Sequence, residues 1–382
     1  MSDARENEGE PVGASEAMKS AASLDIPGVH APQLPYRPRV TRARAPRIAL
    51  VGTGGISASH LNAYRGAGYD VAVICNRTRS KAEERRGEYF PDADVVDDLG
   101  AVLARDDVEV LDITVSPAER APMIEAALEA GRHVLSQKPF VLDLDVGARL
   151  ADLADARGVR LAVNQNGRWA PHLAWIREAV RAGLVGDLLS CHARVHWDHE
   201  WIRDTAFDAV EDLVLQDFGV HWFDFVASLF GNAATSVFAT RARAPSQRSR
   251  PPLLAQALVE LPEGQASLVF DGAVPIGAED ATFVAGTAGS LSSRGPDLAR
   301  QRVTLTTAAG RAEPELVGTW FDDGFHGAMA ELLCAIEDGV EPSHGARGNL
   351  ASLALTFAAV VSSHRREPVV PGTVRRLPSM ST

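Results

Sequence analysis

The chain of 382 residues is short of positive charge, and of lysine in particular. Lysine and arginine together number 38 against 50 aspartates and glutamates, so the formal net charge is −12. Nucleic-acid-binding proteins carry the opposite balance, which excludes nucleic acid as a general partner. Only three of the 38 basic residues are lysines, which leaves 35 arginines. Because the chain so strongly prefers arginine as its basic residue, a lysine at a given position indicates a specific need for an ammonium group.

Cysteines are also few, and long apolar segments are absent. The three cysteines, Cys75, Cys191 and Cys334, are far apart and lack the paired spacing of a metal site. No run approaches the ~20 apolar residues that span a bilayer. The first ten residues have neither the basic nor the apolar region of a secretory signal. These absences predict a soluble, cytoplasmic protein with reduced thiols and no membrane partner.

Short apolar runs alternate with helical segments through the first half of the chain. Strands are expected at 47–51, 70–75, 93–96, 110–114, 133–136 and 159–164. The helices expected between them include 61–67, 99–104, 118–130 and 143–156. Six strands that alternate with helices are typical of a doubly wound parallel sheet. The sequence therefore predicts an α/β fold, with a dinucleotide-binding Rossmann domain over residues 46–165.

The segments on either side of this region differ from it in composition and in the periodicity of their apolar residues. Residues 1–45 are rich in Ala, Ser, Glu and Pro without helical or strand periodicity, which predicts a disordered tail. The basic end of this tail is either a solvated linker or a contact for an anionic partner. Beyond residue 165, alternating runs such as 256–261 and 266–270 indicate antiparallel strands. Residues 166–382 are therefore expected to form an α+β domain with a largely antiparallel sheet.

A glycine-rich loop directly follows the first expected strand. It reads Gly52-Thr53-Gly54-Gly55-Ile56 and opens into the next helix. Glycines there let the backbone approach a pyrophosphate, and the helix N-terminus supplies N–H donors to it. A tight structural turn is the other interpretation, but the strand–turn–helix setting favours a dinucleotide cofactor.

The end of the second strand bears on the choice between NAD and NADP. A carboxylate there would bind the adenosine ribose and repel a 2′-phosphate. The chain instead has Asn76, which can bond the ribose, and Arg77, whose guanidinium suits a phosphate. NADP is therefore favoured over NAD. The alternative is that Arg77 is only a solvated charge.

One of the three lysines follows the fifth strand, in Gln137-Lys138-Pro139. The carboxyl end of a parallel strand faces the crevice in which such sheets bind ligands. In a chain that otherwise uses arginine, Lys138 indicates a need for a compact ammonium able to polarise a hydroxyl. The alternative is a surface lysine at a strand end.

A nearly apolar helix is expected over residues 213–227. Its polar residues, Asp217, His221 and Asp224, fall on one stripe at i, i+4 and i+7. In the catalytic interpretation, His221 takes a hydroxyl proton while Asp217 orients its ring or binds a neighbouring hydroxyl. In the structural interpretation, Asp217 caps the helix and His221 is a core histidine.

Two further clusters are candidates for substrate contacts. His196, Trp197 and the residues after them either line a substrate pocket or, less in keeping with their spacing, hold a metal. No metal is expected. Arg168, at the junction of the two domains, either contacts substrate or cofactor phosphate or packs between the domains.

Three of these segments together resemble the Gfo/Idh/MocA family of NAD(P)-dependent oxidoreductases. They are the glycine loop, Ala126–Phe140 (AALEAGRHVLSQKPF) and Asp217–His221 (DFGVH), and the resemblance extends over residues 46–371. It implies catalytic roles for Lys138, Asp217 and His221, cofactor contacts at Ser116, Gln137 and Lys138, and a dimer or tetramer. The family usually has Glu where this chain has Gln137, and commonly has His where it has Arg120.

The predicted function is hydride transfer between a nicotinamide and a hydroxyl-bearing carbon of a sugar, cyclitol or related polyol. Lys138 and His221 would handle the hydroxyl proton. The resemblance leaves open a glycosidase that uses NAD transiently. The sequence also leaves open a non-catalytic NADP sensor and, last, a metal hydrolase.

Overall fold

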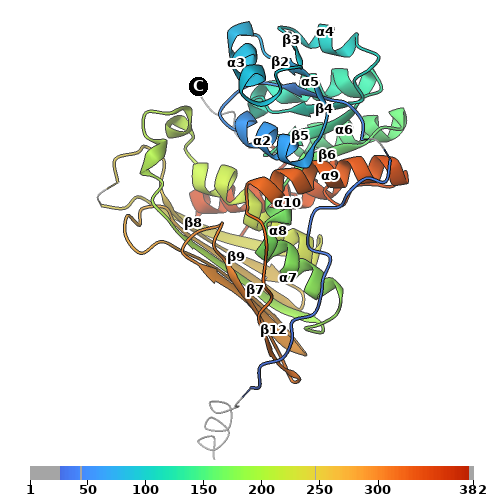
Figure 1. Ribbon diagram of the computed structural model, residues 1–382. Coiled ribbons are helices and arrows are strands. Elements are labelled where there is room, and N and C mark those ends of the chain that lie inside the picture. Colours follow the sequence, from blue (N-terminus) through green and yellow to red (C-terminus); the bar gives the residue numbers. More distant parts are fainter. Residues whose placement is uncertain (1–25, 44, 246, 378–382) are drawn as a thin grey trace, which may run out of the picture.

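A six-stranded parallel sheet forms the first half of the protein, whose computed structural model describes residues 26–43, 45–245 and 247–377 (Figure 1). The strands are β1 (Ile48–Val51), β2 (Val71–Cys75), β3 (Asp94–Val96), β4 (Val110–Ile113), β5 (His133–Gln137) and β6 (Leu161–Asn164). Their order is β3-β2-β1-β4-β5-β6, and every pair is parallel. The order reverses between β1 and β4, which is the point where such sheets bind ligands. The predicted doubly wound sheet is confirmed.

Helices cover both faces of this sheet. They are α2 (Ser57–Ala67), α3 (Arg79–Tyr89), α4 (Leu99–Leu103), α5 (Pro117–Glu129) and α6 (Leu144–Arg157). Helix α2 begins four residues earlier than expected, directly after the glycine loop, so its N-terminus lies at that loop. Helix α6 begins where the Asp143 carboxylate accepts from the N–H groups of Asp145 and Val146, and ends at Gly158 with a φ of 68°.

The second half of the protein is built on an eight-stranded mixed sheet. Its strands are β7 (Leu188–His196), β8 (Ser236–Ala242), β9 (Leu254–Leu261), β10 (Gly264–Asp271), β11 (Glu279–Gly286), β12 (Gly289–Gly295), β13 (Arg302–Thr307) and β14 (Gly310–Ala312). The order is β14-β13-β12-β11-β7-β10-β9-β8, and only β7 and β10 pair in parallel. Buried and exposed residues alternate along β9, as expected of a sheet with one covered face.

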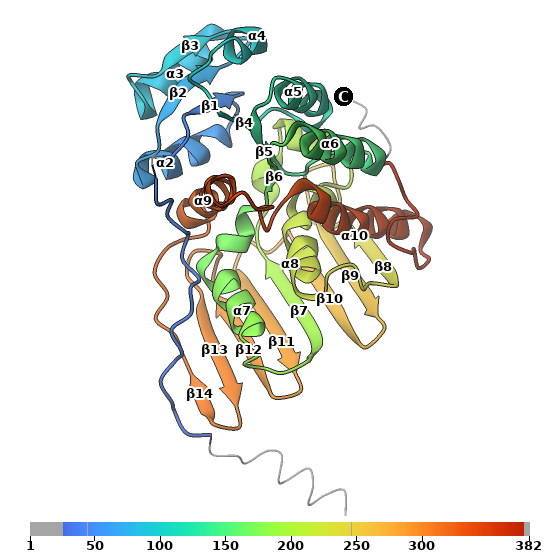
Figure 2. The ribbon, with the colours of Figure 1, turned by 90° about the vertical axis from the view of Figure 1, so that its right-hand side faces the viewer.

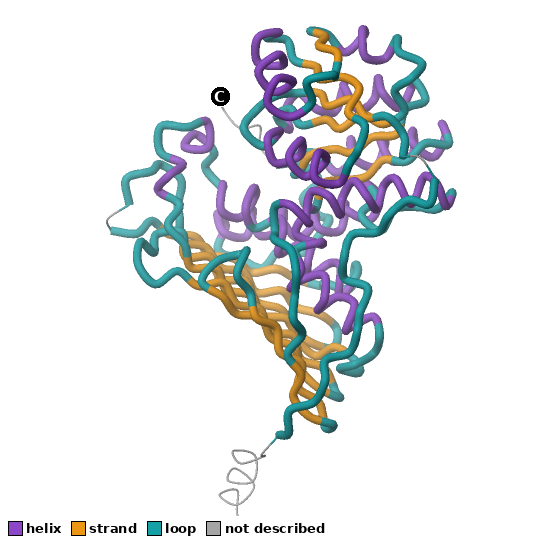
Figure 3. Tube along the Cα trace, viewed as in Figure 1, coloured by secondary structure: helices purple, strands orange, loops and turns teal. Residues whose placement is uncertain are grey.

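Helices of the second half lie on that covered face and between the two sheets (Figures 2 and 3). They are η1 (Asn166–Trp169), α7 (Pro171–Arg181), η2 (Glu200–Ile202), η3 (Ala206–Ala209), η4 (Val214–Phe218), α8 (Val220–Phe230), α9 (Asp322–Asp338) and α10 (Ala346–Arg365). Helices α7, α8 and α10 pack on the sheet, and α9 lies against α2 and β6 of the first half. Within the described part of the chain, no helix is long and apolar enough to cross a membrane.

The N-terminal segment corrects one prediction. Residues 26–43, expected to belong to a disordered tail, run along the second half and then along α9 (Figure 2). The Val29 N–H donates to Arg311 O at 2.9 Å, and Arg39 pairs with Asp338 at 2.7 Å. The segment is held by backbone pairing with β14 and by charge on the acidic end of α9. Neither kind of contact requires a periodic pattern of apolar residues, so the sequence pattern does not predict where this segment lies. Residues 1–25 of the predicted tail lie outside the described residues.

Candidate active site

The glycine loop lies at the carboxyl edge of the parallel sheet and needs glycine at its first position. Gly52 has a φ of 100°, and a Cβ there would lie 2.8 Å from Val115 Cγ1. The Thr114 hydroxyl donates to Gly52 O at 2.6 Å and holds the loop against β4. A Cβ on Gly54 or Gly55 would meet nothing within 4 Å. The loop is therefore packed tightly on its strand side and open on the other.

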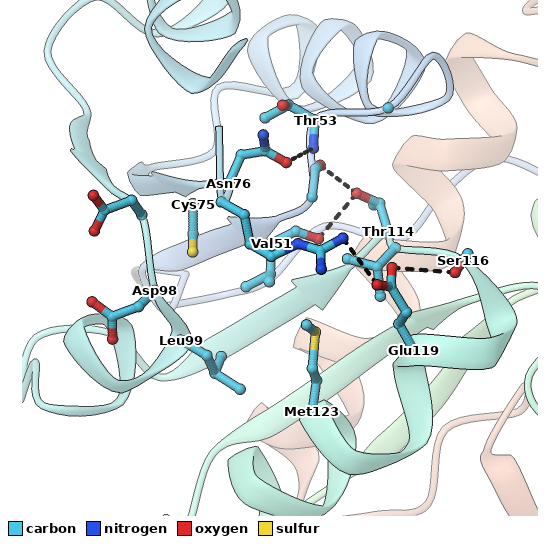
Figure 4. A pocket seen from close by; sticks show the side chains of 15 residues that line it. Val51, Thr53, Cys75, Asn76, Asp98, Leu99, Thr114, Ser116, Glu119 and Met123 are labelled. Carbon is cyan, nitrogen blue, oxygen red and sulfur yellow. Dashed lines mark hydrogen bonds and ion pairs between the residues drawn. The ribbon is translucent and has the colours of Figure 1, made fainter. Parts of the chain in front are cut away.

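A pocket of about 690 Å³, open to solvent, extends from this loop across the ends of β1, β2 and β4 (Figure 4). Its polar residues include Thr53, whose hydroxyl is buried without a hydrogen-bond partner among the described residues, and Asn76, whose Oδ1 lies 3.4 Å from the Thr53 N. Leu99 and Met123 provide an apolar surface on the other side. An unpartnered hydroxyl, exposed loop glycines and an apolar wall fit the phosphates and the adenine of a dinucleotide.

Arg77 lies at this pocket but is not a free charge. Its Nη2 is 2.9 Å from Glu119 Oε1, and the Ser116 hydroxyl donates to Glu119 Oε2 at 3.3 Å. The Arg77 side chain is 79% exposed, so the pair is weak. A cofactor phosphate would have to compete with Glu119 for this guanidinium.

Lys138 and Asp217 meet beside the pocket, at the end of β5. Lys138 Nζ donates to the Asp217 backbone oxygen at 2.8 Å and to its Oδ2 at 3.0 Å. The two side chains are 15% and 20% exposed, so this ion pair is shielded but still open to a small ligand. The structure thus brings together two residues that are 79 positions apart in the sequence.

His221 completes this group. Burial and the nearby Lys138 charge hold the pKa of His221 well below its usual value, so the ring is neutral at physiological pH. Its Nδ1 is buried without a hydrogen-bond partner in the described structure, and its ring packs edge-on against Trp320 at 5.6 Å. Among the described residues no hydrogen bond joins Asp217 to this imidazole, and Asp217 is bonded to Lys138 instead.

The expected single helix over residues 213–227 is two elements. The π-helical η4 carries Asp217, and the α-helical α8 carries His221. Gly219 joins them, and a Cβ there would lie 2.9 Å from the carbonyl oxygens of Val214 and Leu215. Because π-helical turns widen the backbone, the i, i+4 and i+7 stripe of a regular α-helix does not hold across the junction.

The third residue of that stripe, Asp224, pairs with Arg168 in the interior. Arg168 Nε and Nη2 lie 2.6 and 2.8 Å from the two Asp224 oxygens, and Arg168 Nη1 donates to Ser343 O at 2.6 Å. Both residues are at least 92% buried. The packing interpretation of Arg168 therefore replaces the expected contact with substrate or cofactor phosphate.

His196 and Trp197 lie on opposite faces of the second sheet. Side chains alternate along a strand, and Val195, two residues before Trp197, is buried on the covered face. His196 points to the other face, 3.8 Å from Asp271, so its expected place in the pocket is wrong. Trp197 lies in a small apolar pocket with Phe218 and Trp222. Among the described residues, no group of three or more His, Cys, Asp or Glu side chains could hold a metal.

A buried polar network behind Gln137 was not foreseen. His60 Nδ1 lies 2.7 Å from Asp112 Oδ2, and its Nε2 lies 3.2 Å from Gln137 Nε2 and from Asn164 Nδ2. The Lys138 N–H donates to Gln137 Oε1 at 2.6 Å. The four polar side chains come from α2, β4, β5 and β6, so no local pattern could have joined them.

Both halves of the chain match known families. Residues 46–165 match the oxidoreductase family with an NAD-binding Rossmann fold, Gfo/Idh/MocA, and residues 173–292 match the Gfo/Idh/MocA C-terminal domain. The chain belongs to the Gfo/Idh/MocA oxidoreductase family.

Individual relatives bear different names. The chain is 26% identical over 333 residues to inositol 2-dehydrogenase from Rhizobium meliloti, which aligns 83% of this chain with 96% of that protein. It is 28% identical over 202 residues to D-apiose dehydrogenase from Paraburkholderia graminis, half of this chain, and the match spans only 52% of that relative.

A solved oxidoreductase from Agrobacterium radiobacter, in complex with NAD+, L-tartaric acid and magnesium, shares the fold. It superposes with a TM-score of 0.77 at 19% identity and covers 86% of this chain and 99% of that one.

Proposed function

We propose that the protein is an NAD(P)-dependent dehydrogenase or reductase that acts on a CH–OH group of a sugar, cyclitol or related polyol. The observation that carries this proposal is the meeting of Lys138, Asp217 and His221 beside the glycine-loop pocket. The relatives' names, which include dehydrogenases of inositol and D-apiose, support the substrate class. Residues 46–165 would bind the dinucleotide, and residues 166–382 the substrate.

The nicotinamide, when bound, supplies the hydride acceptor or donor, and this chain's residues handle the proton. Asp217 accepts two hydrogen bonds from the Lys138 ammonium and so fixes its position. The positive charge of Lys138 can then stabilise negative charge that develops on the substrate oxygen. The neutral His221 is able to accept the hydroxyl proton, because its ring carries an unprotonated nitrogen. Trp197, Trp222 and Trp320 provide apolar surface near these groups.

We propose NADP as the preferred cofactor. The end of β2 has Asn76 and Arg77 and no carboxylate, and Arg77 lies at the pocket. A 2′-phosphate carries more charge than Glu119 and would draw the guanidinium to itself. Gly52, Thr53, Gly54, Gly55, Ile56, Ser116 and Gln137 would position the rest of the dinucleotide.

We also propose a homo-oligomer, formed through the uncovered face of the second sheet. Leu258 and Phe283 project from that face and are 57% and 43% exposed. Large apolar side chains gathered on one sheet face are typical of an interface.

The test of the proposed reaction compares two lysines. Turnover would be measured by nicotinamide absorbance with NAD+ and NADP+ against myo-inositol, scyllo-inositol, D-apiose and a wider panel of sugars. Lys138→Met should lower kcat by about 10²–10⁴-fold, with cofactor affinity nearly unchanged. Lys81→Met is the matched control, because Lys81 is exposed on α3, and it should leave kcat unchanged. Wild-type turnover in Lys138→Met would contradict the proposal.

A further inference from the structure

Arg120 lies directly beneath Lys138, in the interior of the first half. It belongs to α5 and is 1% exposed. Its Nη1 donates to the carbonyl oxygens of Gln137 and Pro139, the residues on either side of Lys138. Its Nε and Nη2 donate to Val115 O, at 3.2 and 2.6 Å. One guanidinium therefore donates hydrogen bonds to the backbone on both sides of the lysine and links this backbone to the end of β4.

This guanidinium has no carboxylate within salt-bridge distance in the described part of the chain. Burial lowers the pKa of Arg120 to about 9, against the attraction of the Asp217 and Asp112 carboxylates. Arg120 is therefore still protonated at neutral pH, and its charge is balanced only by backbone dipoles and more distant acids. A charge so placed acts on its neighbours with little screening by water.

Gln137 fixes the lysine backbone from the other side and adds no charge. The Lys138 N–H can only donate, so the Gln137 atom that faces it is the oxygen, and the Gln137 NH₂ faces His60 Nε2. His60 Nε2 is then an acceptor, and its proton lies on Nδ1, toward Asp112. A glutamate at position 137 could not donate to this nitrogen.

We propose that Arg120 is a positioning residue of the reaction, which holds the peptide carbonyls on both sides of Lys138. The inference rests on the proposed role of Lys138. The charged and titratable groups that face the lysine are Asp217 from η4, His221 from α8 and Arg120 from α5, with His60 and Asp112 behind Gln137.

Hydrogen exchange of the full-length protein tests this role without a substrate. In Arg120→Gln, exchange at the amides of Gln137, Lys138 and Phe140 should become faster, because the carbonyl oxygens of Gln137 and Pro139 lose their donor and this segment is held less firmly.

Two further variants test the guanidinium geometry. Arg120→Lys keeps the charge but cannot reach all three carbonyls, so exchange at the same amides should become faster in this variant too. Arg132→Gln is the matched control, because Arg132 also donates to backbone carbonyls, those of Leu103 and Arg105, but lies at the opposite end of β5. It should leave exchange at these amides unchanged.

Unchanged exchange at the amides of Gln137, Lys138 and Phe140 in Arg120→Gln would overturn the inference. If Arg120→Gln does not fold, normal exchange at residues 137–140 in Arg120→Lys would overturn it instead. Turnover adds a separate check: kcat of Arg120→Gln should fall at least tenfold with little change in cofactor KM. Loss of turnover in Lys138→Met together with wild-type turnover in the Arg120 variants would reject this inference alone. Full turnover in Lys138→Met would reject the proposed function itself.

Discussion

Replacing Asp224 by asparagine tests the interior role assigned to Arg168. The Asp224 carboxylate is 1% exposed and accepts from Arg168 Nε at 2.6 Å, from Arg168 Nη2 at 2.8 Å and from the Ser352 hydroxyl at 2.7 Å. Asparagine has the same shape but no charge, and its NH₂ would face a guanidinium N–H. Arg168 would remain buried without a counter-charge.

The expected loss follows from these contacts. Breaking a buried ion pair by removing one partner costs about 3–5 kcal/mol, because the remaining charge is left desolvated. In a chain of this size the same loss lowers the melting temperature by roughly 4–6 °C. Ser352→Ala removes one hydrogen bond to the same carboxylate and should cost about 1–2 kcal/mol.

Thermal unfolding followed by circular dichroism measures these losses, with cofactor and substrate affinities measured below the transition. Glu178→Gln, which removes an exposed ion pair with Arg181, should lower the melting temperature by less than about 2 °C. A melting temperature within about 2 °C of wild type in Asp224→Asn would refute the interior role. A selective rise in substrate KM at unchanged stability would restore the substrate contact that we rejected for Arg168.

Four further substitutions have definite expected outcomes. Gly52→Ala should cost about 1–3 kcal/mol of stability and weaken NADPH binding at least tenfold, since the φ of Gly52 is 100° and a Cβ there would meet Val115. Gly55→Ala should keep the stability and weaken only the binding. Glu119→Gln releases Arg77 and should raise NADPH affinity about three- to tenfold relative to NADH, measured by fluorescence titration. The melting temperature of Asp280→Asn, relative to that of the wild type, should rise as the pH increases from about 4 to 8. The reason is that burial raises the pKa of Asp280 to about 7, so the wild type loses stability over this range. Below about pH 4 Asp280 is protonated in the folded and unfolded chain alike, so the gain should vanish; a constant difference across this range would contradict the argument.

The parallel sheet could be predicted because its signals are local. Each strand, such as β1 with four fully buried residues, reads as a short apolar run, and the glycine loop follows it directly. The second sheet was predicted only as a class. Its order, with β7 between β10 and β11, depends on pairings between segments more than 60 residues apart. The N-terminal segment was misread for the same reason, since its partners Arg311 and Asp338 are almost 300 residues away.

The site was predicted in part. Residue type and the family resemblance predict roles for Lys138, Asp217 and His221, and the structure places all three together. Their hydrogen bonds could not be predicted, because the π-helical turn at η4 changes which of them meet. Arg168 and His196 were misplaced, the first by a buried partner 56 residues away and the second by strand alternation.

The central claim is that the glycine loop and the ends of β2 and β4 form a nicotinamide dinucleotide site. Fluorescence titration of the purified, cofactor-stripped protein with NADPH and NADH tests this claim most directly. We predict saturable binding of both, with NADPH the tighter because of Arg77, and at least a tenfold loss for both in Gly52→Ala. Binding of neither dinucleotide to the wild-type protein would contradict the account.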